Sequence, residues 1–586
     1  MTIFMKRLFF SLVCISLIIG CNSKEPVEIP QDTIYDLFAS IDSFETSFAH
    51  QDSLQRGFHL QGNFSSVSDS AYQYKLKVIN QFLNRLNQLP EESFVDRLNN
   101  EVLKYRLENE KSLLTYKSYL VPISAEGGFY NEVNYALPTL PFKTKADYET
   151  YIKWLSNYPT FILQHKELLR QGMSEGIVAS KIVAQNTLKL LQPWLSADKS
   201  PSPFMAPFNN MPNRISEQEQ IELKQEVNEL LATDIFPVYN NLYSFIANEY
   251  LPACTDQIGV SAITNGKEFY QNRLEHYTTL TISADSIFNL GLAEVARIKA
   301  KMEQVKTAAG FTGSLQDYIQ YLRTDKQFYP ETAEELLHYA AWLSKKSEQQ
   351  LPKYFEQLYS LPFTVSPVPE EIAPFYTAGR YSPGSFEQQK AGEYWVNTFN
   401  LPARALYSLP ALTLHEAVPG HHLHHALTSE LTDVPPFRSQ FYISAFGEGW
   451  ALYCEYLGEE MGMYTTPAEW FGRYTYEMWR ACRLVVDVGI HAKGWTRERA
   501  IDYLKENTAL SVHEVTTEID RYIGWPGQAL SYKIGELKIK ELRKHAEETL
   551  GNKFDIRQFH NLLLSQGSLP LPLLEEMVED WIKKSS

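Results

Sequence analysis

The feature that most constrains the fold of this chain is an apolar stripe that repeats with the period of an α-helix. Between residues 283 and 306 the stripe positions recur at spacings of four, four, three and four: Ile287, Gly291, Val295, Ile298 and Met302. Such a stripe covers one helix face and requires a packed neighbour. Ser283 can cap the first turn, where the helix dipole also favours Asp285.

The same period dominates residues 33–360. Residues 216–251 form another long helical pattern, and Pro237 predicts a break within it because proline lacks the amide hydrogen that a helix interior needs. We therefore expect a mainly α protein. Hydrophobic residues make up 44% of the 586-residue chain, which is enough for a large buried core.

A proline-rich stretch at 361–376 ends this region. Residues 392–400, "GEYWVNTFN", are the best strand candidate because they are aromatic and β-branched between turn residues. Helical patterning resumes near 409 and continues to the end. We expect a minor sheet, a mostly helical region at 33–360 and a second region at 361–586 that completes the same cleft, with no sharp boundary between them.

The N-terminus is typical of an exported protein. Lys6 and Arg7 precede a short apolar stretch that ends in "LIIGC", which resembles the bacterial lipobox. We expect a lipoprotein signal peptide at 1–20, a lipidated Cys21 and a polar tether at 21–32, and hence a cell-envelope lipoprotein, facing the periplasm or on the outer membrane. The alternative is an ordinary secretory signal with a chance cysteine.

Charge and cysteine usage exclude several classes. The net charge of −16, with no basic run, argues against a nucleic-acid partner. No segment after the signal is apolar enough to cross a membrane, so contact with a membrane is expected only through the lipid. Beyond Cys14 and Cys21 there remain Cys254, Cys454 and Cys482, which fit neither a disulfide framework nor a thiolate zinc site. Buried small side chains are expected, and a Cys454–Cys482 bridge is the alternative.

The stretch "LHEAVPGHHLHHAL", residues 414–427, begins like the zinc signature His-Glu-x-x-His. His415 supplies a ligand and Glu416 a base for water. The position of the second histidine is Pro419, which cannot bond the carbonyl of His415 and crowds it. Gly420 then permits unusual dihedral angles.

Two histidines compete for the second ligand position. In an unbroken helix, residues seven apart differ by only about 20°, which favours His422 as the partner of His415. Pro419 forbids such a helix, and a local bulge that absorbs two residues would bring His421 to that position instead. We expect His421. His424 and His425 are expected on a helix face, although the dense histidine cluster could also bind metal without catalysis.

The third ligand is expected in "SAFGEGWALYCEYLGEE", residues 444–460. Glu448 begins a helical pattern between Gly447 and Gly449, which would let a second helix come close. Glu455 lies on about the same face and could orient a ligand from behind. The alternative is that Glu448 is a solvated first-turn glutamate favoured by the helix dipole.

Several blocks resemble the bacterial "domain of unknown function 885" family: "LHEAVPGHHLHHAL", "GEGWALYCEYLG", "RACRLVVDVGIHAKGWTRERA", "DRYIGWPGQALSYKIGEL" and "FDIRQFHNLLLSQGSLPL". The resemblance covers about 35–580. It implies a gluzincin-type metallopeptidase with a large, two-lobed helical fold around a cleft, like that of thimet oligopeptidase. Its ligands would be His415, Glu448 and one histidine of "GHH", with Glu416 activating water. Dipeptidyl peptidase III tolerates one extra residue between its histidines, and this chain would need two.

Further site candidates follow from the chemistry of peptide hydrolysis, whose oxyanion needs a donor beyond the metal. Tyr532 and His491 are candidates, with Asp487 placed to hold the tautomer of His491. The alternative for each is a core residue. Three arginines could bind a peptide carboxylate, or could instead form helix-surface ion pairs: Arg480, Arg483 and Arg521. The "YWVNTF" strand, with Asn397, could be a sheet edge that pairs with substrate backbone.

The leading hypothesis is a Zn²⁺-dependent peptidase that cuts short peptides on an envelope lipoprotein. Two alternatives remain. One is a non-catalytic lipoprotein that binds peptides or metal, against which the intact Glu416 argues. The other is a zinc hydrolase of a different amide or ester. The oligomeric state, the side-chain preference and the choice between exo- and endo-cleavage stay open.

Overall fold

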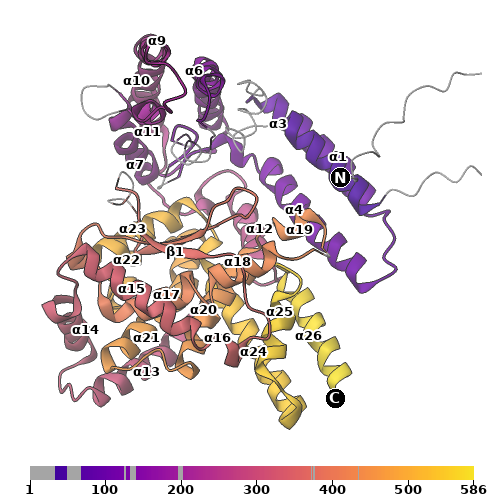
Figure 1. Ribbon diagram of the computed structural model, residues 1–586, viewed down its shortest axis with the longest axis vertical. Coiled ribbons are helices and arrows are strands. Elements are labelled where there is room, and N and C mark those ends of the chain that lie inside the picture. The colour runs from indigo at the N-terminus through magenta and orange to yellow at the C-terminus, as the bar shows by residue number, and fades with distance from the viewer. Residues whose placement is uncertain are drawn as a thin grey trace, which may run out of the picture.

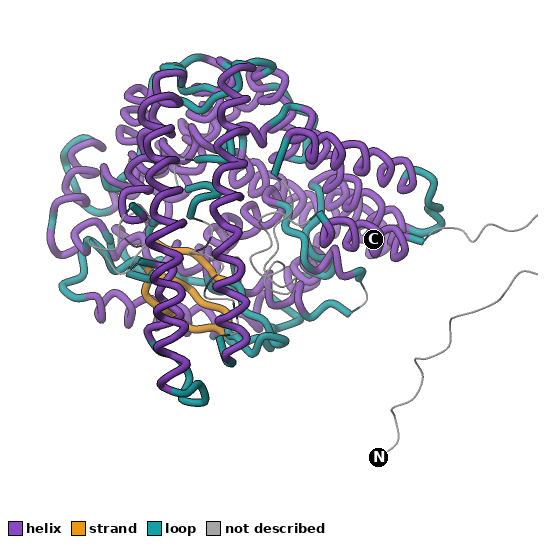
Figure 2. Tube along the Cα trace, turned by 90° about the horizontal axis from the view of Figure 1, so that it is seen from above, coloured by secondary structure: helices purple, strands orange, loops and turns teal. Residues whose placement is uncertain are grey.

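The computed structural model describes residues 33–48 and 67–586, apart from 125–126, 132, 134–136, 138–139, 141, 196–201, 371–372, 374–375 and 433. The signal peptide, Cys21 and the tether lie outside the described residues. The described chain is mainly helical with one small sheet, which confirms the expectation of a mainly α protein with a minor sheet (Figure 1). Seen from above in Figure 2, the three strands form a small patch among helices.

Helices α6, α7, α9, α10 and α11 gather at one end of the molecule, and α1, α3 and α4 run along one side of a larger body (Figure 1). The α-helices before the sheet are α1 (Ile34–Ser47), α3 (Asp69–Leu86), α4 (Phe94–Thr115), α6 (Lys145–Glu175), α7 (Lys181–Leu191), α8 (Ala206–Asn209), α9 (Glu217–Leu230), α10 (Phe236–Phe245), α11 (Leu251–Ala253), α12 (Gly266–Thr278), α13 (Ala284–Ala308), α14 (Leu315–Thr324), α15 (Ala333–Glu348) and α16 (Leu351–Tyr354).

The α-helices after the sheet build most of the larger body, and the last of them form the C-terminal corner in Figure 1. They are α17 (Leu409–Glu416), α18 (His421–Ser429), α19 (Pro436–Ser439), α20 (Ser444–Glu460), α21 (Pro467–Lys493), α22 (Arg497–Asn507), α23 (Val512–Gly524), α24 (Ser531–Leu550), α25 (Ile556–Leu564) and α26 (Leu571–Ser585).

The sheet has the strand order β1-β3-β2, with β1 (Phe363–Pro367) parallel and β2 (Gly379–Ser382) antiparallel to β3 (Gly392–Val396). The strand expected from "GEYWVNTFN" is confirmed as β3. Its expected place at an edge is wrong, because β3 is paired on both sides. β1 lies in the proline-rich stretch that predicted only a break, and Pro367 ends that strand, where a missing amide hydrogen costs little.

The apolar stripe of α13 is confirmed. Its five stripe positions are buried, and Ser283 Oγ accepts the backbone N–H of Ser286 at 3.1 Å. The stripe packs along α21, where a Cβ at Gly291 would lie 2.8 Å from Leu484 and Val485. This contact joins the region before residue 360 to the region that carries the histidine motif.

No helix end occurs at Pro237. A π-helical turn, Leu231–Ile235, comes directly before α10, and a second one, Ile246–Tyr250, comes before Pro252. Each of these wider turns accommodates the proline that follows it. The proline has no amide hydrogen to donate, yet the helix continues. The expected break at Pro237 is therefore replaced by a local widening.

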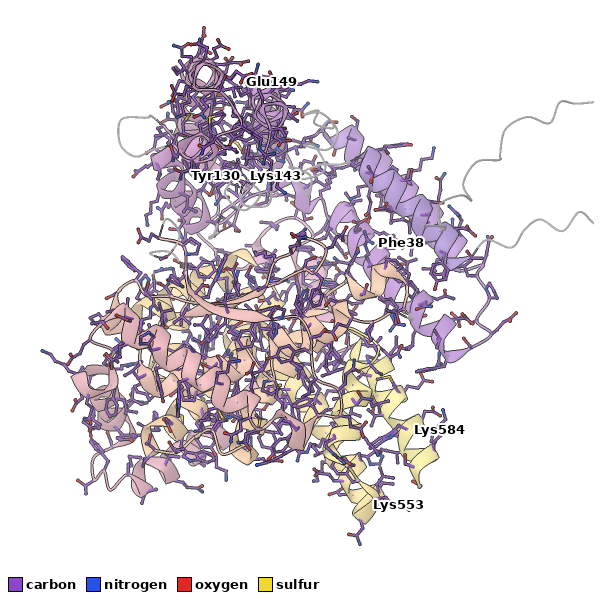
Figure 3. All side chains as sticks on the ribbon, in the orientation of Figure 1. Phe38, Tyr130, Lys143, Glu149, Lys553 and Lys584 are labelled. Carbon is purple, nitrogen blue, oxygen red and sulfur yellow. The ribbon has the colours of Figure 1, made fainter. Side chains whose placement is uncertain are left out.

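Two further sequence predictions concern the cysteines and membrane-spanning helices. The cysteines at 254, 454 and 482 are free and buried, so the bridge between the last two does not form. No described helix is both long and apolar enough to cross a membrane. In Figure 3, Phe38 marks the helix α1; its ring packs 5.1 Å from that of Phe437 in α19 and joins the first described helix to the main body.

Candidate metal centre

Three side chains from two stretches of the sequence meet at one point of the larger body. Glu448 Oε2 lies 3.5 Å from His415 Nε2 and 3.3 Å from His421 Nε2. One ligand atom from each residue falls within 4.8 Å of the others, and this is the only such group of three or more His, Cys, Asp or Glu among the described residues. Atoms at about 2.0–2.1 Å from a tetrahedral zinc are roughly 3.3 Å apart, so this donor set fits zinc with a fourth position free.

The chain reaches this geometry by breaking the helix. α17 ends at Glu416 and α18 begins at His421, so the expected bulge within one helix is wrong. A Cβ at Gly420 would lie 1.9 Å from the carbonyl oxygen of His415, so only glycine lets the chain pass this close.

Other parts of the fold satisfy the carbonyl groups of this break. The indole of Trp450 donates to the Pro419 carbonyl at 2.9 Å, and Ser347 Oγ donates to the Val418 carbonyl at 2.7 Å. The His422 N–H donates to the Ala417 carbonyl at 3.1 Å. A buried break is thus held without losing backbone hydrogen bonds at these groups.

The two competing histidines point in different directions. His421 turns toward His415, with ring centroids 4.8 Å apart and planes at 86°. His422 is fully buried on the other side, with Nδ1 3.0 Å from the Tyr381 hydroxyl and its ring against Tyr359 and Phe363. Burial lowers the pKa of His422 to about 3, so its ring stays neutral.

A buried carboxylate orients His415 from behind. His415 Nδ1 lies 2.8 Å from Glu455 Oε1, which in turn lies 3.4 Å from Arg480 Nη2. This is the position expected for Glu455, and a partner of this kind fixes which ring nitrogen faces a metal. Burial disfavours the charged ring, but hydrogen bonds to Glu448 and Glu455 outweigh it and raise the pKa of His415 to about 9.

Glu448 carries the negative charge of the cluster. Burial alone would raise the pKa of Glu448, but the adjacent His421 and His415 hold it well below the usual range. The sequence left open a solvated glutamate at a helix terminus; its side chain is instead 14% exposed and faces both rings. Gly449 acts as expected, since a Cβ there would lie 2.5 Å from Gly535 of α24.

The cluster opens onto a cavity of about 740 Å³. Its wall holds Glu416, whose Oε2 accepts the backbone N–H of Tyr381 in β2 at 2.8 Å. β2 is an edge strand and lines the cavity through residues 379–381. His424 and His425, expected as residues of a helix face, also line it. All of its lining residues lie between 377 and 568.

Tyr532 lines the cavity as expected. Its ring stacks at 17° on that of His415, 6.2 Å away, and the Arg483 guanidinium lies 4.1 Å from the tyrosine ring centroid. Tyr532 therefore stands between the histidine cluster and a group of arginines.

Those arginines are Arg480, Arg483 and Arg521, and all three line the cavity. Glu518 Oε2 accepts Arg483 Nη2 at 2.9 Å and Arg521 Nη2 at 3.0 Å. Burial raises the pKa of Glu518, but the two guanidinium groups outweigh it and lower it to about 2. The two guanidinium groups thus meet at one carboxylate in the cavity wall.

Tyr442 is a site residue that the sequence reasoning missed. It lines the cavity beside Glu448. A Cβ at Gly447 would lie 2.2–2.5 Å from its ring, so this glycine makes room for Tyr442 and not for a second helix. Tyr442 is 47% exposed as a residue, but partial desolvation of its hydroxyl, followed by the Glu448 charge, raises its pKa above the usual value, so the hydroxyl stays protonated. Gly447, directly before Glu448, was the only signal in the sequence, and it did not identify Tyr442.

Two expected site residues lie elsewhere. His491 is fully buried outside the cavity, with Nε2 2.9 Å from the Tyr522 carbonyl and Nδ1 accepting the Val260 N–H. Asp487 accepts from Tyr270 and Gly527 instead of holding His491. Asn397 is also fully buried, and its amide donates to the carbonyls of residues 373, 376 and 377. Backbone bonds occupy both side chains, which corrects the expectation of catalysis or substrate binding.

Two solved structures share this architecture. One is described as "the putative lipoprotein from Colwellia psychrerythraea" and is 26% identical, with a TM-score of 0.87 over 94% of this chain and 100% of that one. The other, "a putative lipoprotein of unknown function from Shewanella oneidensis", is 17% identical, with a TM-score of 0.70 over 92% and 98% of the two chains. No curated protein matches the chain.

The fold and the histidine-lined cavity thus define a large helical protein in which His415, His421 and Glu448 form a group that could hold a metal ion. The chain belongs to the family described as "bacterial protein of unknown function (DUF885)", whose sequence model matches residues 51–578. This confirms the resemblance in the motif blocks at the level of the family.

Proposed function

We propose that the protein is a zinc-dependent peptidase of the gluzincin type that hydrolyses short peptides. The observation that carries the proposal is the convergence of His415, His421 and Glu448 in one cavity with Glu416 in its wall. Two imidazoles and one carboxylate form a catalytic zinc donor set because they leave a position open. The cleft-containing fold of thimet oligopeptidase is the corresponding structural proposal.

Zinc held by these residues would supply Lewis-acid activation of water and of the scissile carbonyl. Glu416 takes a proton from the attacking water and passes it on to the leaving amine. The backbone N–H of Tyr381 holds one oxygen of this carboxylate at 2.8 Å, which fixes its orientation. Tyr442 and Tyr532 line the same cavity as hydroxyl donors for the developing oxyanion.

Substrate is positioned by two further features of the wall. The edge strand β2 offers backbone groups to an extended peptide, in the role expected of "YWVNTF". The arginine group beyond Tyr532 lines the cavity with guanidinium groups, which bind a peptide carboxylate. A binding protein without catalysis would need neither the base nor its fixed orientation.

We also propose that the protein is an envelope lipoprotein anchored through Cys21. The solved relatives are described as lipoproteins, and "LIIGC" precedes a polar tether. Mass spectrometry of the mature N-terminus tests this: a diacylated Cys21 is expected, and an unmodified N-terminus elsewhere contradicts it.

The function is tested by metal analysis and a peptide-library digest of the wild type and of Glu416→Gln. We expect about one zinc per chain in both proteins and hydrolysis only in the wild type. Removal of a general base lowers the rate by about 10²–10⁴-fold. Zinc with no hydrolysis in the wild type would favour the non-catalytic alternative, and near wild-type rates in Glu416→Gln would exclude the assigned role.

A further inference from the structure

A second cavity, of about 370 Å³, is lined by residues of α4, α7, α12 and the end of α23. Figure 1 shows these helices at the junction between the upper helical group and the larger body. Most of its wall is apolar or aromatic, including Leu113, Tyr116, Val183, Ile258, Phe269 and Ile523. In the described part of the chain it shares only Trp525 with the lining of the histidine cavity, so it is a separate compartment.

Arg273 of α12 brings a charge into this wall. The residue is 3% exposed, and its guanidinium bonds neutral side chains: Asn109 at 2.8 Å, Ser112 at 3.3 Å and the neighbouring Asn272. The aromatic rings of Phe269 and Tyr277 lie 5.3 and 6.0 Å from it. No carboxylate of the described residues forms an ion pair with it. A buried charge without a counter-charge is costly, so a cation in this position favours an anion brought by a ligand.

Two polar atoms on the same wall lack partners. Arg273 Nε and Ser180 Oγ are buried and form no hydrogen bond. Buried polar groups are nearly always hydrogen-bonded, so these two atoms require partners from within the cavity, which water or a ligand supplies. A carboxylate is the acceptor that best matches a guanidinium N–H, and the apolar body of such a ligand would lie against the aliphatic and aromatic walls.

We propose that this cavity is a binding site for a small carboxylate with an apolar body, such as a medium-chain fatty acid, whose carboxylate is held by Arg273. The charge is complementary, the walls match an aliphatic chain, and the site is independent of the histidine cluster.

The test is calorimetric titration of the full-length mature protein with octanoate and with octanamide. The two probes share the apolar body and differ in charge. We expect the wild type to bind octanoate at least tenfold more tightly than octanamide, and Arg273→Gln to lose this difference. Val183→Phe places a larger side chain in the cavity and leaves residue 273 unchanged, so it should weaken the binding of both probes.

Arg438→Gln is the matched control. Arg438 is also buried and bonded only to neutral groups, Asn99 and the Gln566 carbonyl, but it is not part of this wall. It should keep the wild-type preference for octanoate. The proposal is overturned if the wild type does not discriminate between the probes, or if Arg273→Gln binds octanoate as the wild type does. Arg521→Gln, in the histidine cavity, gives a further check: loss of octanoate binding there, and not in Arg273→Gln, would place the anion in the other cavity.

Discussion

Gly420 lies where the carbonyl oxygens of Leu414 and His415 leave no room for a side chain. Together with Pro419 it ends α17, turns the chain and starts α18 at His421. The six-residue separation between the two histidines would place them on different faces of a straight helix. Single residues therefore decide which histidine faces Glu448.

Zinc binding is expected to depend on His421 and not on His422. We expect His421→Ala to lose stoichiometric zinc and His422→Ala to retain it, because only the His421 ring lies beside His415 and Glu448. Metal analysis after gel filtration measures both, and folding is checked by circular dichroism. Zinc retained by His421→Ala and lost from His422→Ala would show that the break rearranges when metal binds.

At the scale of elements, α21 and α23 form one side of the histidine cavity and are joined through Glu518 between Arg483 and Arg521. α24 closes the same side with Tyr532. The next residue, Lys533, is fully buried and does not line the cavity. Lys533 Nζ lies 2.8 Å from Glu477 of α21 and 3.1 Å from Glu294 of α13. The ion pairs of Lys533 thus connect α24 with α21 and α13.

The group formed by Arg480, Arg483 and Arg521 predicts a preference for peptides with a free C-terminal carboxylate. We expect the wild type to cleave a peptide with a free C-terminal carboxylate about 10–100-fold more efficiently than its C-terminal amide, since a charge-assisted bond contributes about 1.5–3 kcal/mol. Arg521→Gln should bring the ratio of the two kcat/KM values toward one. This ratio does not depend on the fraction of folded enzyme.

Arg380→Gln is the control for that experiment, because Arg380 lines the same cavity on β2 and stacks on Tyr376. It should leave the preference unchanged. Equal cleavage of acid and amide by the wild type would reject carboxylate recognition while leaving the peptidase proposal intact.

The ion pairs of the buried Lys533 are expected to contribute strongly to the free energy of unfolding. Lys533→Met should lower the free energy of unfolding by about 3–5 kcal/mol, because it leaves Glu477, Glu536 and Glu294 without their shared cation. Lys540→Met, whose partly exposed ammonium lies 3.4 Å from Glu536, should cost far less. Urea unfolding at pH 7 measures both, and equal losses would show that burial of Lys533 carries no special weight.

At the scale of the whole molecule, the fold brings together helices that are hundreds of residues apart in sequence, as α13 and α21 show. Asp487 of α21 is one such meeting point, since it accepts from Tyr270 of α12 at 2.7 Å and from the Gly527 N–H. Burial raises the pKa of the Asp487 carboxyl from 3.8 to about 7.

This shift predicts how global stability depends on pH. Between pH 4 and 7 the folded state keeps a proton that the unfolded chain has released, so stability falls as pH rises through this window and stays lower above it. The contribution is on the order of 4 kcal/mol at most. Asp487→Asn should flatten this part of the curve relative to the wild type. Asp520→Asn, whose carboxylate pairs with Arg497, is the control. Thermal unfolding from pH 4 to 8 checks the prediction, and parallel curves for wild type and Asp487→Asn would contradict it.

What the sequence determined by itself follows from short-range physics. The α13 stripe, its Ser283 cap and the position of β3 depend on periods and hydrogen bonds within a few residues, and each is confirmed. The family was recognisable from its motif blocks. His415, Glu416 and Glu448 were candidates because zinc chemistry requires a ligand beside a base and an acidic partner.

Only the tertiary structure decided which side chains share a cavity. Tyr442 lies at the site because Gly447 leaves space for its ring, and His491 lies outside it because backbone groups of residues 260 and 522 occupy both of its nitrogens. β3 is the central strand and β2 forms the edge beside Glu416, although nothing in their sequences indicates which strand is central and which lies at an edge. Such outcomes depend on contacts between residues far apart in the chain, and local periodicity contains no information about those contacts.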